Sequence, residues 1–323
     1  MNSFGRMLKM QIFGESHGQG VGILLDGVPA GLSLSEKDFI KDIERRNPNI
    51  KGTTARKELD IPLFFSGVFK GKTTGSPLLI CFINQDVDSS TYEKIKNTPR
   101  PGYADFTSWL KSGGFADYRG GGHFSGRITV GLVAAGVVAK KLLGDIKIEA
   151  VAKVNATLLE SAINSGNSLG GIVECKIKGV PAGIGEPFFD SLESLISHAA
   201  FSIPGVKAIE FGVGFKAAFM NGSEYNDIIL DAKGKTKTNN AGGINGGISN
   251  GNEINFKVAI RPSASIAIVQ ETIDFSSGKK SKIKTEGRHD VCFALRVPVS
   301  LEAVTALVLA DLMLCEQKIK RVL

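Results

Sequence analysis

Two short clusters in the sequence place titratable and cationic side chains beside glycines, a pattern suited to anion binding and proton transfer. Residues 14–18 (GESHG) set the hydroxyl of Ser16 beside the imidazole of His17 in a glycine-bounded turn. Residues 118–127 (YRGGGHFSGR) hold three consecutive glycines between Arg119 and Arg127. Glycines let a ligand approach backbone N–H groups, and guanidinium groups bind phosphate or carboxylate oxygens. The alternative for each cluster is a solvated surface turn.

A third cluster, residues 284–290 (KTEGRHD), brings together the cation of Arg288, the imidazole of His289 and the carboxylate of Asp290. The chain contains only four histidines, and three of them lie in these clusters. That concentration favours a catalytic or binding role, although a single histidine is more often structural.

The segment that follows the second cluster, residues 129–143 (TVGLVAAGVVAKKLL), is apolar on nearly every side up to Lys140. This pattern predicts a buried helix, whose N-terminus would add its dipole to an anion site in the preceding turn. A second long apolar helix is predicted over residues 300–322.

In the rest of the chain, strand-like segments outnumber predicted helices. They span residues 21–26, 61–69, 78–84, 146–154, 172–178, 208–215, 254–260 and 266–273. They do not alternate with helices, so an α+β fold is favoured over a doubly wound sheet, with residues 1–323 as a single domain. The pentapeptide GVPAG occurs at 27–31 and 179–183. Each copy follows a predicted strand and precedes a predicted helix, over 35–46 and from Asp190, which suggests two related halves.

Composition limits the kinds of partner. The chain has 323 residues and a formal charge of +7, which suits either nucleic acid or small polyanions. A single Trp and four Tyr argue against a platform for stacking bases, although 19 Phe keep that reading open. The four cysteines are far apart in sequence and predict neither a metal site nor disulfides. We expect a soluble, cytoplasmic protein that binds neither membrane nor nucleic acid.

Two further glycine-rich segments can each be interpreted in two ways. Residues 239–251 (NNAGGINGGISNG) form either a mobile loop or a backbone cradle for a ligand. Residues 212–217 imitate a dinucleotide-binding fingerprint, but no strand-helix-strand context surrounds them.

Taken together, three long motifs resemble the signature blocks of the chorismate synthase family. They are GESHGQGVGILLDGVPAG (14–31), RGGGHFSGRITVGLVAAG (119–136) and RHDVCFALRVPVSLEA (288–303). The resemblance extends to TTGSP (73–77), GVPAGIGEPFFD (179–190), EFGVGF (210–215), the segment at 239–251 and RPSAS (261–265). It therefore covers nearly the whole chain.

The resemblance implies a β-α-β sandwich fold and a lyase of the shikimate pathway, which makes precursors of the aromatic amino acids. Family members eliminate phosphate in trans-1,4 fashion from 5-enolpyruvylshikimate 3-phosphate to give chorismate, and they require reduced FMN without net redox change. Homotetramers are usual. Because no dinucleotide fingerprint is convincing, we expect an external flavin reductase, with NADPH acting only indirectly if at all.

Carried over by motif, the resemblance assigns roles to individual residues. His17 would act at the leaving phosphate, and Asp290 with Ser16 would relay the proton away through the flavin's central ring nitrogen. The substrate's anionic groups would be bound by Arg45, Arg46, Lys51, Arg56, Arg119, Arg127 and Arg288. FMN would contact His123, Phe124, Ser125, Pro204, Gly205, Gly246, Arg261, Pro262, Ser263, Ala264, Ser265 and Arg288.

The sequence departs from the family pattern at two places. Tyr103 stands where relatives usually have a histidine thought to support the anionic reduced flavin. A tyrosine hydroxyl donates a hydrogen bond but carries no positive charge. A segment that relatives have between about residues 155 and 167 is also missing. Two alternatives to a fully active enzyme follow: an FMN-binding homologue impaired by Tyr103, and a basic RNA-binding or scaffold protein on the same fold.

Overall fold

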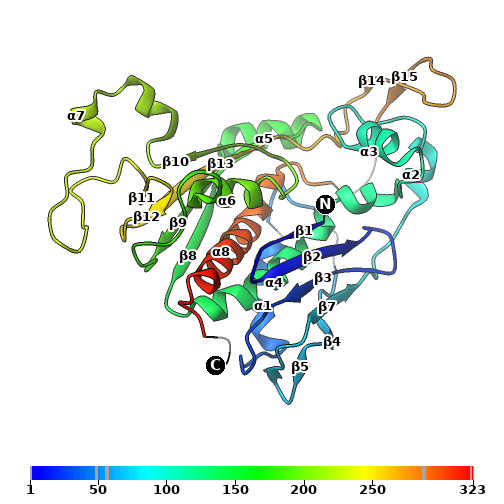
Figure 1. Cartoon of the computed structure of the whole chain (residues 1–323). Helices are drawn as coiled ribbons and strands as arrows, with labels where there is room; N and C mark the ends of the chain where they lie inside the picture. Colours follow the sequence, from blue (N-terminus) through cyan, green and yellow to red (C-terminus); the bar gives the residue numbers. More distant parts are fainter. Residues whose placement is uncertain (1, 48–49, 55–57, 286–288, 321, 323) are drawn as a thin grey trace.

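Two antiparallel sheets form the outer layers of the protein (Figure 1). The computed structural model describes residues 2–47, 50–54, 58–285, 289–320 and 322. The first sheet has the order β1-β2-β3-β7-β4, with bounds Ser3–Phe4, Lys9–Gly14, Gly20–Asp26, Leu78–Ile83 and Leu63–Ser66. The second has the order β10-β13-β9-β8, with bounds Val206–Phe211, Ile254–Ile260, Gly171–Lys178 and Lys147–Lys153.

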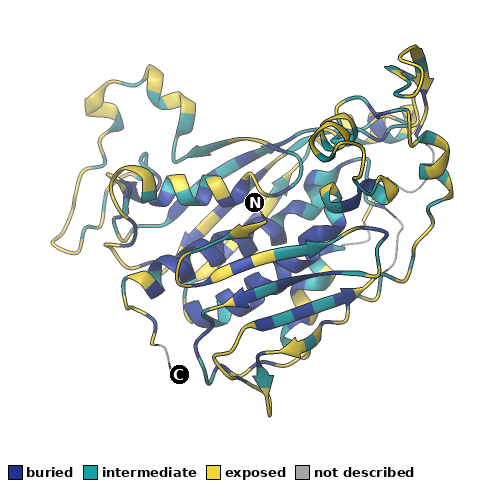
Figure 2. Cartoon of the chain, turned by 45° about the vertical axis from the view of Figure 1, so that its right-hand side comes forward, coloured by how far each residue is buried: buried dark blue, intermediate teal, exposed yellow. Residues whose placement is uncertain are grey.

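Two apolar helices, α4 (Thr129–Leu143) and α8 (Val297–Cys315), pack against each other between the sheets (Figures 1 and 2). Helix α4 lies on β3 and β7, and α8 lies on β8 and β9, so both helices are buried on nearly every side. A Cβ added at Gly136 would lie 2.3 Å from the Cβ of Ala303, so this glycine permits the close contact of the two helices. The predicted α+β sandwich is confirmed.

Shorter helices flank this central pair. Helix α1 (Lys37–Arg46) packs on both α4 and α8, and α6 (Leu192–Ala200) packs on α8 and β10. Each copy of the GVPAG pentapeptide connects a strand to one of these helices, as predicted. The cap of α6 is Ser191 instead of Asp190, because the Ser191 side chain accepts a hydrogen bond from the Ser194 N–H at 3.1 Å.

Helix α8 buries two carboxylates, and each has partners. Asp311 accepts the backbone N–H groups of residues 6–8 at 2.7 to 3.0 Å and so attaches the N-terminal segment to the helix. Glu302 accepts hydrogen bonds from Arg45 at 2.6 Å, Lys140 at 2.8 Å and the Ala150 N–H at 2.9 Å. Within the described ranges, Phe293–Cys315 is the one helical stretch long and apolar enough to cross a bilayer, but 94% of its 18-residue window is buried. It is therefore a core helix.

Several elements differ from the sequence prediction. The last helix spans Val297–Cys315 instead of 300–322, because the backbone leaves the helical conformation at Gln317, whose φ is +54°. Only β14 (Gln270–Ile273), paired with β15 (Lys280–Ile283), forms within 266–273. The helices α2 (Ser90–Ile95), α3 (Asp105–Ser112), α5 (Ala156–Ser165) and α7 (Gly222–Tyr225) were not expected. Small two-stranded pairs complete the structure: β5 (Val68–Phe69) with β6 (Lys72–Thr73), and β11 (Ile244–Asn245) with β12 (Ile248–Ser249).

Candidate active site

A pocket lies at the N-terminal ends of α4 and α8, where the loops that precede both helices meet. It gathers residues from each third of the sequence. Among the described residues its lining consists of Ser16, Arg46, Asn47, Thr54, Glu58, Tyr92, Arg100, Tyr103, Gly120, Phe124, Ser125, Gly126, Arg127, Pro204, Gly205, Arg261, Pro262, Ser263, Ala264, Ser265, His289, Asp290, Phe293 and Arg296.

The first two sequence clusters form a single unit at this pocket. Gly120, Gly121 and Gly122 all have positive φ, at 60°, 82° and 53°, which turns the chain sharply against the 14–18 turn. The N–H of Ser16 donates to the Gly122 carbonyl at 3.1 Å. A Cβ added at Gly120 would lie 2.5 Å from His17 Nε2 and 2.9 Å from Ser16 Oγ. Only glycine therefore allows the backbone to touch both candidate catalytic side chains.

Hydroxyl groups hold the Ser16 and His17 side chains in place. Ser16 is fully buried, and its Oγ accepts a hydrogen bond from Ser125 Oγ at 3.2 Å. His17 Nδ1 lies 2.8 Å from Ser89 Oγ, and its ring meets the edge of Tyr92 at a centroid distance of 5.3 Å. The other ring nitrogen, Nε2, is the one that borders Gly120 at the pocket wall.

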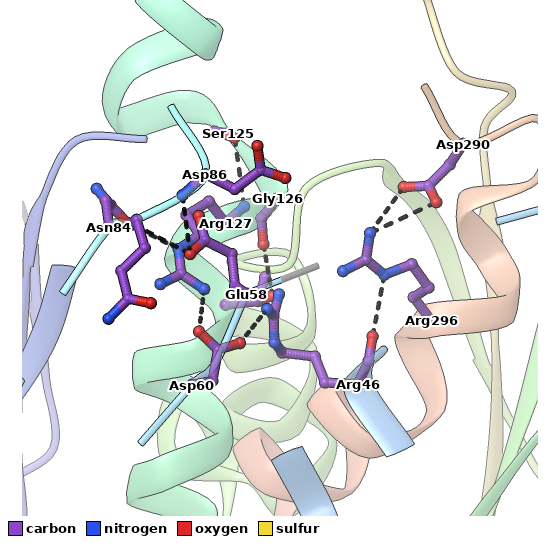
Figure 3. Close-up of polar contacts among 12 residues, drawn as sticks. Arg46, Glu58, Asp60, Asn84, Asp86, Ser125, Gly126, Arg127, Asp290 and Arg296 are labelled. Atoms are coloured by element: carbon purple, nitrogen blue, oxygen red, sulfur yellow. Dashed lines mark hydrogen bonds and ion pairs between the residues drawn. The ribbon is translucent and has the colours of Figure 1, made fainter. Parts of the chain in front are cut away.

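Two buried arginines, Arg46 from the end of α1 and Arg127 from the turn before α4, share the carboxylate of Asp60 (Figure 3). The distance from Arg46 Nη2 to Asp60 Oδ2 is 2.7 Å, and Arg127 Nη1 donates to Oδ1. Arg127 Nε also donates to Asn84 Oδ1 at 2.9 Å. Burial, together with the positive charge of Arg46, lowers the pKa of Arg127 although Asp60 opposes the shift, so the site favours a further anion next to this guanidinium.

Asp290 lies on the other side of the pocket, beside α8 (Figure 3). Its Oδ1 accepts the Thr54 N–H at 2.8 Å, and its Oδ2 lies 3.2 Å from Arg296 Nη1. Arg296 Nε also donates to the backbone carbonyl of Arg46 at 2.9 Å. Arg296 therefore connects Asp290, the candidate proton acceptor, to Arg46 of the arginine pair. The sequence interpretation did not assign this role to Arg296.

A third wall consists of Phe124, Pro204, Gly205 and residues 261–265. Gly205 has a φ of +93°, a backbone conformation that glycine adopts more readily than other residues. Behind this wall, Arg100 donates to Ser265 Oγ at 3.1 Å and forms a bidentate pair with Asp105 at 2.8 Å.

Tyr103 lies against Arg100 at the same side of the pocket. The guanidinium carbon of Arg100 is 3.9 Å from the centre of the Tyr103 ring, and the Tyr103 hydroxyl donates to the Phe124 carbonyl at 3.2 Å. Burial raises the pKa of Tyr103, although Arg100 opposes the shift. The tyrosine is therefore a neutral hydrogen-bond donor at neutral pH, and positive charge next to it comes from Arg100.

Several residues assigned by resemblance lie outside the pocket lining. Arg45 pairs with Glu302 and Asp42, and Lys51 pairs with Glu160 at the surface. Arg119 turns back to Asp117 at 2.9 Å.

Three further candidate residues, His17, His123 and Gly246, are also absent from the pocket lining, although His17 borders it through Gly120. His123 places Nδ1 2.8 Å from the Gly14 carbonyl and lines a neighbouring, more apolar cavity. Gly246 lies in the turn between β11 and β12, within 239–251, which makes a hydrogen-bonded hairpin away from the pocket. Arg56 and Arg288 lie outside the described residues.

Buried guanidinium groups around a pocket, with an imidazole and a carboxylate at its edges, define an enzyme site for a small polyanionic substrate. Comparison with known proteins identifies the enzyme class. The family model for chorismate synthase matches residues 8–158 and 152–314. The chain belongs to the chorismate synthase family and is a lyase.

Individual relatives agree with this assignment. A chorismate synthase of Chitinophaga pinensis is 56% identical over 329 residues, covering 100% of this chain and 99% of that protein. One from Pyrococcus abyssi is 44% identical and covers 95% of this chain and 96% of its own. A crystal structure of a chorismate synthase superposes with a TM-score of 0.74 at 26% identity, covering 97% of this chain and 93% of the other. These findings favour the enzyme over an RNA-binding or scaffold protein.

Proposed function

We propose that this pocket eliminates phosphate from 5-enolpyruvylshikimate 3-phosphate to form chorismate, with reduced FMN bound beside the substrate. The observation that carries the proposal is Arg127: its Nη2 is buried at the pocket and has no hydrogen-bond partner among the described residues. A buried guanidinium N–H without an acceptor costs free energy that an anionic ligand would recover.

The arginine pair is suited to one anionic group of the substrate. Arg46 and Arg127 expose only 5% and 3% of their side chains, so an anion bound between them is largely removed from water. Charge-assisted hydrogen bonds are stronger in such surroundings than at a surface. Arg261, which lines the opposite wall, is available for a second anionic group of substrate or cofactor.

The wall made of Phe124, 204–205 and 261–265 fits a flavin. It offers an apolar face, small side chains and backbone groups, which is what a planar ring with a polar edge requires. When bound, reduced FMN supplies electron density as phosphate departs and regains it as hydrogen is removed, so no net redox change occurs. Phe124, Pro204, Gly205 and the 261–265 segment would hold it.

The remaining side chains move protons. His17 Nε2 faces the glycine turn at the pocket wall, where an imidazolium would neutralise charge on the leaving phosphate. Asp290 and Ser16, which line the same pocket, accept and pass on the proton that leaves the substrate.

An anaerobic assay of phosphate release with photoreduced FMN tests the proposal. Wild-type protein should release phosphate only when substrate and reduced flavin are both present, and His17→Ala should release it at least about a hundred-fold more slowly. Binding of FMN and substrate without any turnover by wild-type protein would refute the catalytic role. It would favour a homologue that only binds these ligands.

The assembly and cellular setting belong to the same proposal: a cytoplasmic homotetramer that receives reduced flavin from an external reductase. Support for subunit contacts comes from four phenylalanines with exposed fractions of 77% to 92%. They are Phe188, Phe189, Phe215 and Phe219. Large exposed aromatic groups of this kind are typical of protein interfaces. Sedimentation equilibrium of the wild type and of a Phe215→Ser, Phe219→Ser variant would show whether these residues hold subunits together.

A further inference from the structure

Asp60 is a buried carboxylate between the two arginines of the pocket. It exposes only 3% of its side chain and lies shortly before β4, in a segment without a glycine-rich motif. Each carboxylate oxygen serves a different guanidinium: Oδ2 accepts from Arg46 at 2.7 Å, and Oδ1 accepts from Arg127. A single residue thus sets the relative position of two groups that come from α1 and from the turn before α4.

The charges in this cluster do not cancel. Burial alone would raise the pKa of Asp60, but Arg46 and Arg127 outweigh burial and hold that pKa below its usual value. Asp60 is therefore ionised at neutral pH. Within this cluster Asp60 balances only one of the two guanidinium charges, and Glu58, which lines the pocket, is the further carboxylate that acts on Arg127.

Arg127 is restrained at two of its three guanidinium nitrogens. Nε donates to Asn84 Oδ1 at 2.9 Å, and Nη1 donates to Asp60. The remaining nitrogen, Nη2, is buried and has no hydrogen-bond partner in the part of the chain that the structure describes. Because the guanidinium is planar, the two restrained positions fix the direction of the third.

We propose that Asp60 is a positioning residue that holds Arg46 and Arg127 as a pair for one anionic group of the substrate, and that it controls substrate affinity. This inference rests on the proposed function, since it names the residue that arranges the substrate-binding arginines. Asp60 does not contact the substrate in this proposal. It acts through the two guanidinium groups.

Asp42 provides a matched control because it makes the same kind of contact elsewhere. It is also buried, at 8% exposure, and it bridges two cations, Arg45 at 3.2 Å and Lys140 at 2.7 Å. It does not line the pocket. Replacing either carboxylate by its amide removes one buried charge between two cations, but only the Asp60 change affects the pocket.

The test compares Asp60→Asn with Asp42→Asn in steady-state kinetics and in calorimetric titration with inorganic phosphate in the absence of flavin. In Asp60→Asn the amide N–H faces a guanidinium N–H, so the arginine pair separates. We expect KM to rise and phosphate affinity to fall by at least about ten-fold. Asp42→Asn should keep both values within about two-fold of wild type while losing stability.

Two outcomes would overturn the proposal. One is an Asp60→Asn protein with unchanged KM and unchanged phosphate affinity, in which only the apparent kcat falls; this would mean that Asp60 serves folding alone. The other concerns a second variant, Asp60→Glu, which is made in case Asp60→Asn does not fold. A wild-type KM in Asp60→Glu, despite its longer side chain, would also contradict the proposal. If wild-type protein shows no turnover, the proposed function fails, but the phosphate titration still decides the role of Asp60.

Discussion

Replacing Gly120 by alanine should impair catalysis far more than folding. A Cβ at this position would lie 2.3 Å from His17 Cδ2, so the imidazole must move by about 1 Å to reach an ordinary contact distance. A misplacement of about 1 Å in a reacting group costs roughly a hundred-fold in rate. The backbone at residue 120 has φ of 60°, which adds a cost of about 1 kcal/mol for alanine.

Gly113→Ala separates these two effects. Gly113 follows α3 with φ of 62°, and a Cβ there would meet nothing within 4 Å. Both variants should share a similar backbone cost in urea unfolding, to which Gly120→Ala adds the overlap with His17 and Ser16. Only Gly120→Ala should lose about a hundred-fold in kcat under anaerobic reduced flavin. If the kcat of Gly120→Ala stays within about three-fold of Gly113→Ala, the contact with His17 does not matter for the reaction.

Three further changes have expected outcomes. Asn84→Leu removes the acceptor for Arg127 Nε and both hydrogen bonds from the Asn84 amide to the 15–18 turn. Steady-state kinetics should show that kcat/KM falls by at least about ten-fold, and circular dichroism should show that the protein stays folded. Tyr103→His should raise chorismate formation, because an imidazolium adds positive charge beside the flavin; an unchanged rate would contradict the view that Tyr103 limits activity. Glu302 has a lowered pKa because its two cation partners outweigh burial. The stability advantage of wild type over Glu302→Gln should be full above about pH 5 and shrink as pH falls below about 4, in urea titrations.

The bounds of two central elements could be predicted from local sequence patterns. Residues 129–143 and 254–260 were predicted with the bounds that α4 and β13 have. The first is an apolar run too long for a typical strand, and the second has apolar residues on alternate positions, the period of a strand. Helices α2 and α3 bury no residue completely, and a surface helix of six or eight residues has too little apolar periodicity to be recognised.

The site was only partly predictable for a similar reason. Arg45 and Arg46 are adjacent in a helix, so their side chains point about 100° apart and only one of them reaches the pocket. No local sequence pattern shows which of the two arginines reaches the pocket. Asp60 and Asn84 lie near strand ends with no motif that marks them, and their partner Arg127 is 67 and 43 positions away. Arg296 was recognisable by analogy, because like Arg127 it directly precedes an apolar helix.

The position of the pocket at the ends of α4 and α8 has a consequence for folding. Its lining extends from Ser16 to Arg296, so the site exists only after the first sheet, both core helices and the second sheet have assembled. Contacts so distant in sequence form late and slowly. We therefore expect the ligands of this pocket to bind the complete fold and not its fragments. A ligand at a hundred times its Kd would protect the whole chain from unfolding, and from proteases that act on the unfolded chain, by about 2.7 kcal/mol.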